Sequence, residues 1–112
     1  MNTYSPFLCI FWRNMKESKF QHELIKELKE RFPGCMVMKN DPNYIQGIPD
    51  LTILYENKWA TLECKNSPKA HHQPNQDYYV EKMNNMSYSS FIDSESKGEV
   101  LDELEKIFGI RR

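Results

Sequence analysis

Two acidic residues and a lysine, Asp50, Glu63 and Lys65, stand at the ends of apolar stretches of the sequence. Asp50 immediately precedes the apolar run 51–55, and Glu63 directly follows the run 59–62. A charged side chain in an apolar strand is costly unless it is paired, bound to a metal or placed at the open end of a sheet. Carboxylate oxygens are ligands that Mg²⁺ prefers, and a lysine can stabilise negative charge that develops during hydrolysis. The three residues therefore predict a hydrolytic metal site.

The spacing between the glutamate and the lysine is a weak signal by itself. A glutamate two residues before a lysine also occurs at Glu17, Glu27, Glu56 and Glu95. Those four lie in or near predicted helices or in a turn, which are ordinary places for solvated charge. Only Glu63 ends an apolar strand, so its position rather than its spacing makes it a candidate.

A β-hairpin is expected to bring the three residues together, because a polar turn separates the two apolar runs. Side chains alternate across a strand, so Glu63 and Lys65 share one face. With an even-numbered loop such as Asn57-Lys58, Asp50 pairs with Lys65 and lies diagonal to Glu63 on that face. The two carboxylates are then roughly 7–8 Å apart, a gap that one divalent cation can bridge. A three-residue loop would place Asp50 on the opposite face.

Apolar spacing along the rest of the chain predicts the elements that position this hairpin. Apolar residues three and four apart indicate helices, and short apolar runs bounded by Pro, Gly, Asn or Asp indicate strands. The expected fold class is α/β with a mixed four-stranded sheet flanked by helices, because the crossover after the third strand permits parallel pairing. The predicted elements, in the order α-β-β-β-α-β-α, are a helix over 18–32, strands over 35–39, 51–55 and 59–65, a helix over 74–86, a strand over 87–92 and a helix over 100–108.

The length of 112 residues is that of one domain, and 39% hydrophobic with 28% charged residues is typical of a folded protein. A formal charge of -1 gives no overall basic field that would indicate nucleic-acid binding. This balance does not exclude a nuclease, because an acidic metal site offsets basic surface in the sum. Three cysteines without a close pair fit neither a disulfide framework nor a zinc site, so we expect a reducing, cytoplasmic setting.

Residues 1–17 are expected to form an apolar extension ahead of a single domain over 18–112, with Ser18 as the N-cap of the first helix. The run 7–12 follows no basic residue and is shorter than a membrane span. We therefore expect neither a signal peptide nor a membrane partner. The run is expected to pack against the domain or against a second copy of the chain.

The residues Gly47-Ile48-Pro49-Asp50, followed after twelve residues by Glu63-Cys64-Lys65, resemble the motif of the PD-(D/E)XK nuclease superfamily, and the Gly-Ile-Pro-Asp start is similar to its VRR-NUC branch. The resemblance covers most of the chain and implies a restriction-endonuclease-like core, in agreement with the predicted element order. It implies that Asp50, Glu63 and the backbone carbonyl of Cys64 bind Mg²⁺ or Mn²⁺. It also implies that Lys65 orients the attacking water.

Gln76 is a further catalytic candidate, because it shares a helical stripe with Tyr79, Val80 and Met83 on the face expected to meet the sheet. Similar nucleases place a glutamine there, near the phosphate or the water. Gln73 is the competing glutamine. A purely local role for Gln76 at the start of the helix is the alternative interpretation.

Glu23 resembles the helix carboxylate that many family members add to the metal site, although a solvated carboxylate is an equally good interpretation. Lys69, His71 and His72 form a local basic patch that is expected to contact nucleic-acid phosphates. A merely solvated loop is the alternative for this segment. Adjacent histidines point in different directions, so a zinc site is not expected.

The resemblance implies a Mg²⁺- or Mn²⁺-dependent DNA endonuclease without a small-molecule cofactor, similar to small phage-type enzymes. Branched or junction DNA is the sharper substrate hypothesis, and it favours a homodimer because symmetric substrates suit two-fold partners. The alternative is a catalytically inactive nuclease-fold module that binds another protein. Retention of three desolvated charges on one face argues against that alternative, and metal binding would discriminate between the two.

Overall fold

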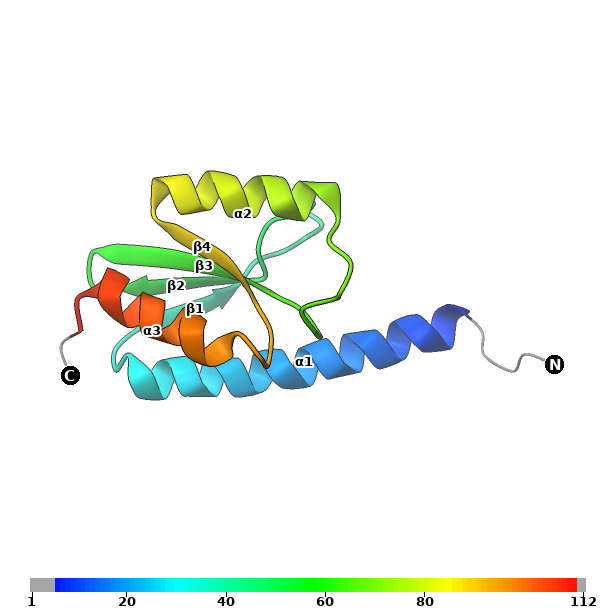
Figure 1. The fold of residues 1–112 in the computed structure, drawn as a ribbon, viewed down its shortest axis with the longest axis horizontal. Helices are drawn as coiled ribbons and strands as arrows, with labels where there is room; N and C mark the ends of the chain where they lie inside the picture. Colours follow the sequence, from blue (N-terminus) through cyan, green and yellow to red (C-terminus); the bar gives the residue numbers. More distant parts are fainter. Residues whose placement is uncertain (1–5, 111–112) are drawn as a thin grey trace.

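A mixed four-stranded sheet with helices on both faces forms the centre of the molecule (Figure 1). The structure, a computed structural model, describes the backbone of residues 6–110 and the side chains of residues 18–110. The predicted fold class and element order are confirmed. The elements are α1 (Pro6–Arg31), β1 (Met36–Lys39), β2 (Leu51–Tyr55), β3 (Lys58–Cys64), α2 (Pro74–Met86), β4 (Tyr88–Ile92) and α3 (Lys97–Phe108).

The strands lie in the order β1-β2-β3-β4. The β1/β2 and β2/β3 pairs are antiparallel, and the β3/β4 pair is parallel. Parallel neighbours need a crossover connection, which α2 supplies between β3 and β4. The predicted mixed sheet is therefore correct, and it places the ends of β3 and β4 side by side.

The apolar core lies on the face of the sheet that α1 and α3 cover. Its rings include Phe32 of α1 and Phe108 of α3, whose centroids are 5.2 Å apart in an edge-to-face arrangement. Strand residues alternate, so β2 and β3 give every second side chain to this core and the others to the opposite face. The buried apolar residues are Leu24, Leu28, Phe32, Leu51, Ile53, Ala60, Leu62, Cys64, Ile92, Val100, Leu101, Leu104 and Phe108.

The first helix is longer than predicted. It begins at Pro6 and runs without a break to Arg31, so the expected helix start at Ser18 is wrong. Proline suits the first turn of a helix, and no proline or glycine interrupts residues 7–32. The backbone of residues 6–17 thus continues α1, whereas the predicted packing of the run 7–12 lies outside the described side chains. Among the described residues, no helix is both long and apolar enough to cross a membrane.

The β2–β3 hairpin closes through a two-residue loop, Glu56-Asn57, with Tyr55 paired to Lys58. The expected even-numbered loop is confirmed, but the strand begins at Lys58, so the loop lies one residue earlier than Asn57-Lys58. The predicted pairing of Asp50 with Lys65 is therefore wrong by two residues. Continuing the observed register from the Leu51–Leu62 pair places Asp50 across from Glu63 instead.

Replacing Glu56 with glycine is expected to stabilise the hairpin by about 0.5–1 kcal/mol. Glu56 has a φ of 54°, a left-handed conformation in which a side chain meets its own backbone and glycine does not. Chemical denaturation of the variant would measure the gain. Glu56→Ala loses the carboxylate but keeps a Cβ, so it should show no comparable gain; equal stabilisation of both variants would contradict a backbone origin.

Candidate active site

The face of the sheet that α2 covers carries buried polar side chains beside apolar ones such as the paired Leu54 and Trp59. The buried hydroxyl of Thr61 on β3 donates to Ser89 Oγ at 2.8 Å and lies 3.5 Å from the sulfur of Met83 on α2. Helix α2 has no fully buried residue. Its half-buried side chains include the predicted stripe of Gln76, Tyr79, Val80 and Met83. Polar side chains of β3 thus lie between the sheet and a helix that has no fully buried side chain of its own.

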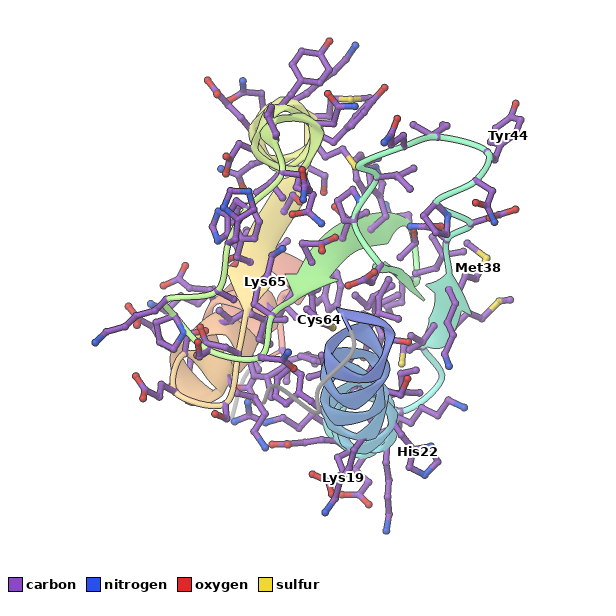
Figure 2. The ribbon with its side chains drawn as sticks, turned by 90° about the vertical axis from the view of Figure 1, so that its right-hand side faces the viewer. Lys19, His22, Met38, Tyr44, Cys64 and Lys65 are labelled. Carbon is purple, nitrogen blue, oxygen red and sulfur yellow. The ribbon has the colours of Figure 1, made fainter. Side chains whose placement is uncertain are left out.

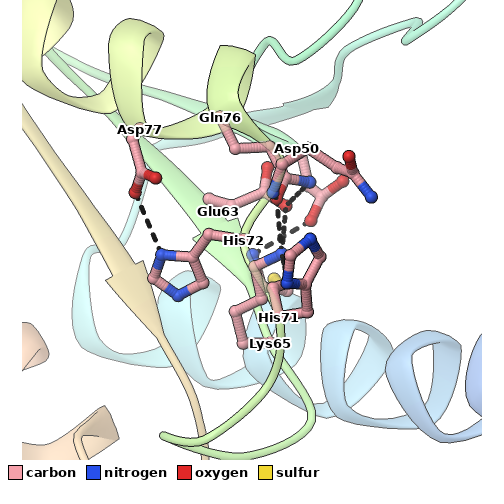
Figure 3. A network of polar contacts seen from close by, with 9 residues as sticks. Asp50, Glu63, Lys65, His71, His72, Gln76 and Asp77 are labelled. Atoms are coloured by element: carbon pink, nitrogen blue, oxygen red, sulfur yellow. Dashed lines mark hydrogen bonds and ion pairs between the residues drawn. The ribbon is translucent and has the colours of Figure 1, made fainter.

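Asp50 and Glu63 meet beneath α2 at the open end of the β2–β3 hairpin (Figure 3). Cys64 and Lys65, which mark this end, face the viewer in Figure 2. Asp50 Oδ2 accepts a hydrogen bond from the backbone N–H of Cys64 at 2.9 Å, and the Asp50 and Glu63 side chains are in hydrogen-bonding contact. The Glu63 side chain is only 4% exposed. Asp50 is half-buried, and two carboxylates in contact away from bulk water repel each other when both are ionised, unless a proton or a cation lies between them.

Burial raises the pKa of Asp50 above its ordinary value. The Cys64 N–H, the charge of Lys65 and the contact with Glu63 oppose that shift without cancelling it. The ionised form of Asp50 is therefore stabilised less in the folded chain than in water. A further positive charge near Asp50, such as a bound cation, would stabilise its ionised form.

Lys65 directly follows β3 and points into the same space (Figure 3). Its ammonium donates to Gln76 Oε1 at 2.6 Å and to the backbone carbonyl of His71 at 3.1 Å. It lies 3.9 Å from Glu63 Oε2. The residue is only 7% exposed, so these contacts fix the ammonium beside the carboxylates rather than in solvent.

Gln76 joins the other members of the site. Its amide nitrogen donates to Glu63 Oε2 at 3.1 Å, while its oxygen accepts from Lys65 and from the backbone N–H of Gln73 at 2.9 Å. Helix α2 begins at Pro74, with Gln73 as the N-cap. The structure thus places the Gln76 side chain among the charged groups, where the same amide completes the helix start and bridges Lys65 and Glu63. Its catalytic role stays a prediction.

The segment before β2 holds Asp50 in place. The Asn40 side-chain amide donates to the carbonyl of Pro49 and to Thr52 Oγ1, both at 2.8 Å, and the Asn40 N–H donates to the Asp50 carbonyl at 2.8 Å. Gly47 has a φ of 90° and packs against the first turn of α2, where an added Cβ would overlap Asn75. Asn40 and the His71 carbonyl were not predicted from the sequence.

This arrangement of sheet and helices has a counterpart among solved structures. The fold is similar to that of a VRR_NUC domain protein. The two structures match with a TM-score of 0.60, over 81% of this chain and 88% of that chain, at 14% sequence identity. No protein-family model matches the sequence, and no curated protein matches it. At this identity the likeness is one of fold, and the expected restriction-endonuclease-like architecture is confirmed.

Within the VRR_NUC-like fold, the structure does not bring Glu23 to the carboxylate pair. Glu23 is exposed on α1, which covers the opposite face of the sheet, and it lines a shallow groove with Asn66 and Ser94. Among the residues whose side chains are described, no three His, Cys, Asp or Glu side chains come close enough to hold a metal ion. The solvated interpretation of Glu23 therefore fits the geometry better than the metal-ligand one.

The predicted basic patch is divided in the structure. The ring of His72 stacks on Phe91 at 3.9 Å, and its Nδ1 lies 3.0 Å from Asp77 Oδ1 (Figure 3). These contacts hold His72 against β4 and α2, apart from Lys69 and His71. Its predicted contact with phosphates is not tested by this placement. The exposed residues Lys69 and His71 line a pocket of about 510 Å³ that reaches Lys65. Their predicted role in phosphate contact stays a prediction.

Replacing Asp50 with asparagine is expected to raise the melting temperature of the protein at neutral pH in the absence of divalent cations. The folded chain holds the Asp50 proton more tightly than the unfolded chain, since burial raises the pKa of this carboxyl. Stability is then lost as the pH rises from the ordinary aspartate value through the raised one. Asparagine removes this loss and keeps an oxygen for the Cys64 N–H. Melting curves of both proteins at acidic and neutral pH would measure the effect, and a variant that is less stable at neutral pH would contradict it.

Proposed function

We propose that this chain is a metal-dependent nuclease that hydrolyses phosphodiester bonds in DNA. The observation that carries the proposal is the contact between the half-buried carboxylate of Asp50 and the buried carboxylate of Glu63, beside the ammonium of Lys65. Three charged groups withdrawn from water on one face contribute little to stability by themselves. They suit a site that binds a cation and a phosphate. The similarity of the fold to a VRR_NUC domain protein supports the proposal.

Asp50 and Glu63 would hold Mg²⁺ or Mn²⁺, with the backbone carbonyl of Cys64 as a further ligand. Their donor set fits such an ion, because Mg²⁺ is usually bound through one or two carboxylates and fills its other positions with water and substrate phosphate. Among the described residues, no third His, Cys, Asp or Glu side chain joins this pair, and a two-carboxylate site is compatible with this chemistry. When bound, the ion would polarise the phosphate and favour ionisation of water.

Lys65 would act on the substrate directly. An ammonium has three N–H donors, of which Gln76 and the His71 carbonyl use two. The third is available to orient the attacking water or to neutralise charge on the phosphate. Gln76 keeps Lys65 and Glu63 in one network, so it would fix the ammonium at a constant distance from the carboxylates.

The finer proposal is that the DNA is branched and that two copies of the chain cut it as a homodimer. A two-fold dimer would present two identical sites to a symmetric substrate such as a four-way junction. Comparison of a four-way junction with a linear duplex of the same sequence would test the substrate, and sedimentation of the free protein would test the dimer.

Incubation of the purified protein with supercoiled plasmid, a linear single strand and a four-way junction, with Mg²⁺, Mn²⁺ or EDTA, tests the proposal. We expect cleavage with either metal and none with EDTA. Metal should also stabilise the folded protein by about 2.7 kcal/mol at a concentration one hundred times its Kd. This stabilisation should be absent in Asp50→Asn. If no substrate is cut and neither metal raises the melting temperature, the chain is an inactive module that keeps the fold.

A further inference from the structure

Tyr44 lies on the β1–β2 connection with its side chain 85% exposed, the highest exposure among the large hydrophobic side chains described as exposed. It forms no ring contact with the other side chains that the structure describes. Figure 2, which looks onto the end of the sheet that carries Lys65, shows Tyr44 at the outer edge of that end, pointing away from the body of the protein. An aromatic ring is thus presented to solvent at the same end of the molecule as Lys65.

The loop that carries Tyr44 is held in one conformation by its own hydrogen bonds. The Asp41 side chain accepts from the N–H of Asn43 at 2.8 Å, and the Asp41 carbonyl accepts from the N–H groups of Tyr44 at 3.1 Å and Ile45 at 3.4 Å. The contacts of Asn40 and Gly47 described above fix both ends of the loop. A ring on such a loop loses little conformational freedom when a flat ligand binds to it.

A groove connects this loop with the catalytic residues. It has a volume of about 320 Å³ and lies between the loop and the first turn of α2. Gln76, which binds both Lys65 and Glu63, is one of its lining residues. The groove therefore borders the hydrogen-bond network of the site at Gln76. Its lining residues are Pro42, Gln46, Gly47, Gln73, Pro74, Asn75 and Gln76.

We infer that Tyr44 stacks on an unpaired nucleobase of the substrate, a step that rests on the proposed nuclease function. A strand whose phosphate lies at Asp50 and Glu63 and that follows the groove past Gln76 brings a neighbouring base to the loop. Bases in a continuous duplex have both faces covered by their neighbours, so an exposed ring gains most from a base that is unpaired. Stacking of this kind tolerates any base sequence, since every base has a flat face.

The experiment is a binding titration with an oligonucleotide that carries 2-aminopurine at one unpaired position, in EDTA so that nothing is cut. Stacking on an aromatic ring quenches the fluorescence of this base. We expect the wild-type protein, Tyr44→Phe and Tyr44→Trp to quench it. Tyr44→Ala should lose the quenching and bind about tenfold more weakly.

Tyr78→Ala is the matched control, because Tyr78 is a second exposed tyrosine, 54% exposed on α2, outside the groove. It should bind and quench as the wild type does. A fully paired duplex should bind Tyr44→Ala and wild type equally. Equal quenching and affinity of Tyr44→Ala and wild type on the unpaired probe would overturn the proposal and leave a protein surface as the partner of the ring.

The titration also separates this proposal from the nuclease proposal. Quenching that depends on Tyr44 in a protein that cuts no substrate with either metal would support base stacking and contradict only the nuclease activity. Cleavage at the same rate and with the same affinity in wild type and Tyr44→Ala would support the nuclease and contradict only the stacking.

Discussion

Replacement of Lys65 with alanine is expected to lower the rate of metal-dependent phosphodiester cleavage by about 10³-fold. The variant loses the ammonium that lies 3.9 Å from Glu63 Oε2, and with it the donor that is proposed to contact the phosphate. The loss should fall on kcat more than on KM, because charge develops on the phosphate only as the reaction proceeds. Initial rates of plasmid nicking over a range of DNA concentrations would measure both constants.

Lys82→Ala is a suitable control for this prediction, because Lys82 is an exposed lysine of α2. It should cut DNA at the wild-type rate, so that a loss in Lys65→Ala is not a general effect of lost positive charge. Circular dichroism of Lys65→Ala would show whether it folds. A folded Lys65→Ala protein that cuts as fast as the wild type would contradict the assignment of Lys65 to the reaction.

Replacement of Gly47 with alanine is expected to destabilise the protein by about 3 kcal/mol or more and to abolish cleavage. An alanine there would combine a left-handed φ of 90° with a Cβ that overlaps the Asn75 side chain and lies 2.8 Å from its carbonyl carbon. The loop or the start of α2 must then move. Either movement displaces Gln76 from Lys65 and Glu63. Chemical denaturation and the plasmid assay would measure the two effects.

Gly34→Ala separates the two causes of this effect. Gly34 has nearly the same φ, 89°, but an added Cβ would meet nothing within 4 Å. Gly34→Ala should therefore lower the stability only through the strain of an alanine at a left-handed φ, about 1 kcal/mol, and should leave cleavage unchanged. If both variants lose the same stability and Gly47→Ala remains active, the packing of Gly47 against α2 does not position the site.

Most of the fold follows from apolar periodicity. Helix α2 begins and ends at the predicted residues, and β2 has the predicted bounds, because turn-forming residues flank both elements. The start of α1 was missed because the consecutive apolar residues 7–12 show no helical period. Periodicity reports one buried face, and a helix that continues past the body of a protein need not have one.

The side chains that meet in the candidate site were predictable because each stands out against its local background. Asp50 precedes one apolar run, Glu63 follows another, and Gln76 is a polar residue within an apolar helical stripe. The exact pairing across the hairpin was not predictable, since it depends on Glu56 adopting a left-handed conformation that glutamate rarely takes. A loop at Glu56-Asn57 instead of Asn57-Lys58 shifts the pairing by two residues and still keeps both carboxylates on one face.

The contacts that surround the site had no signature in the sequence. A backbone carbonyl such as that of His71 carries no side-chain identity, so its contact with Lys65 depends only on the tertiary path of the chain. The amide of Asn40 reaches Thr52, twelve residues away, through strand pairing. His72 was expected on a basic patch with Lys69 and His71. Its stacking on Phe91 was not foreseen, because it joins segments that are distant in sequence. Local patterns do not contain such distances.

Helix α2 supplies Gln76 but has no fully buried side chain, whereas α1 and α3 are anchored in the core. Little apolar area therefore opposes a local opening in which α2 lifts from the sheet while the rest of the chain stays folded. Backbone amides of α2 should exchange with deuterated water faster than those of α3. Closure of α2 over bound metal and nucleic acid would slow that exchange. The rate of cleavage would then depend on the fraction of molecules in which α2 is closed.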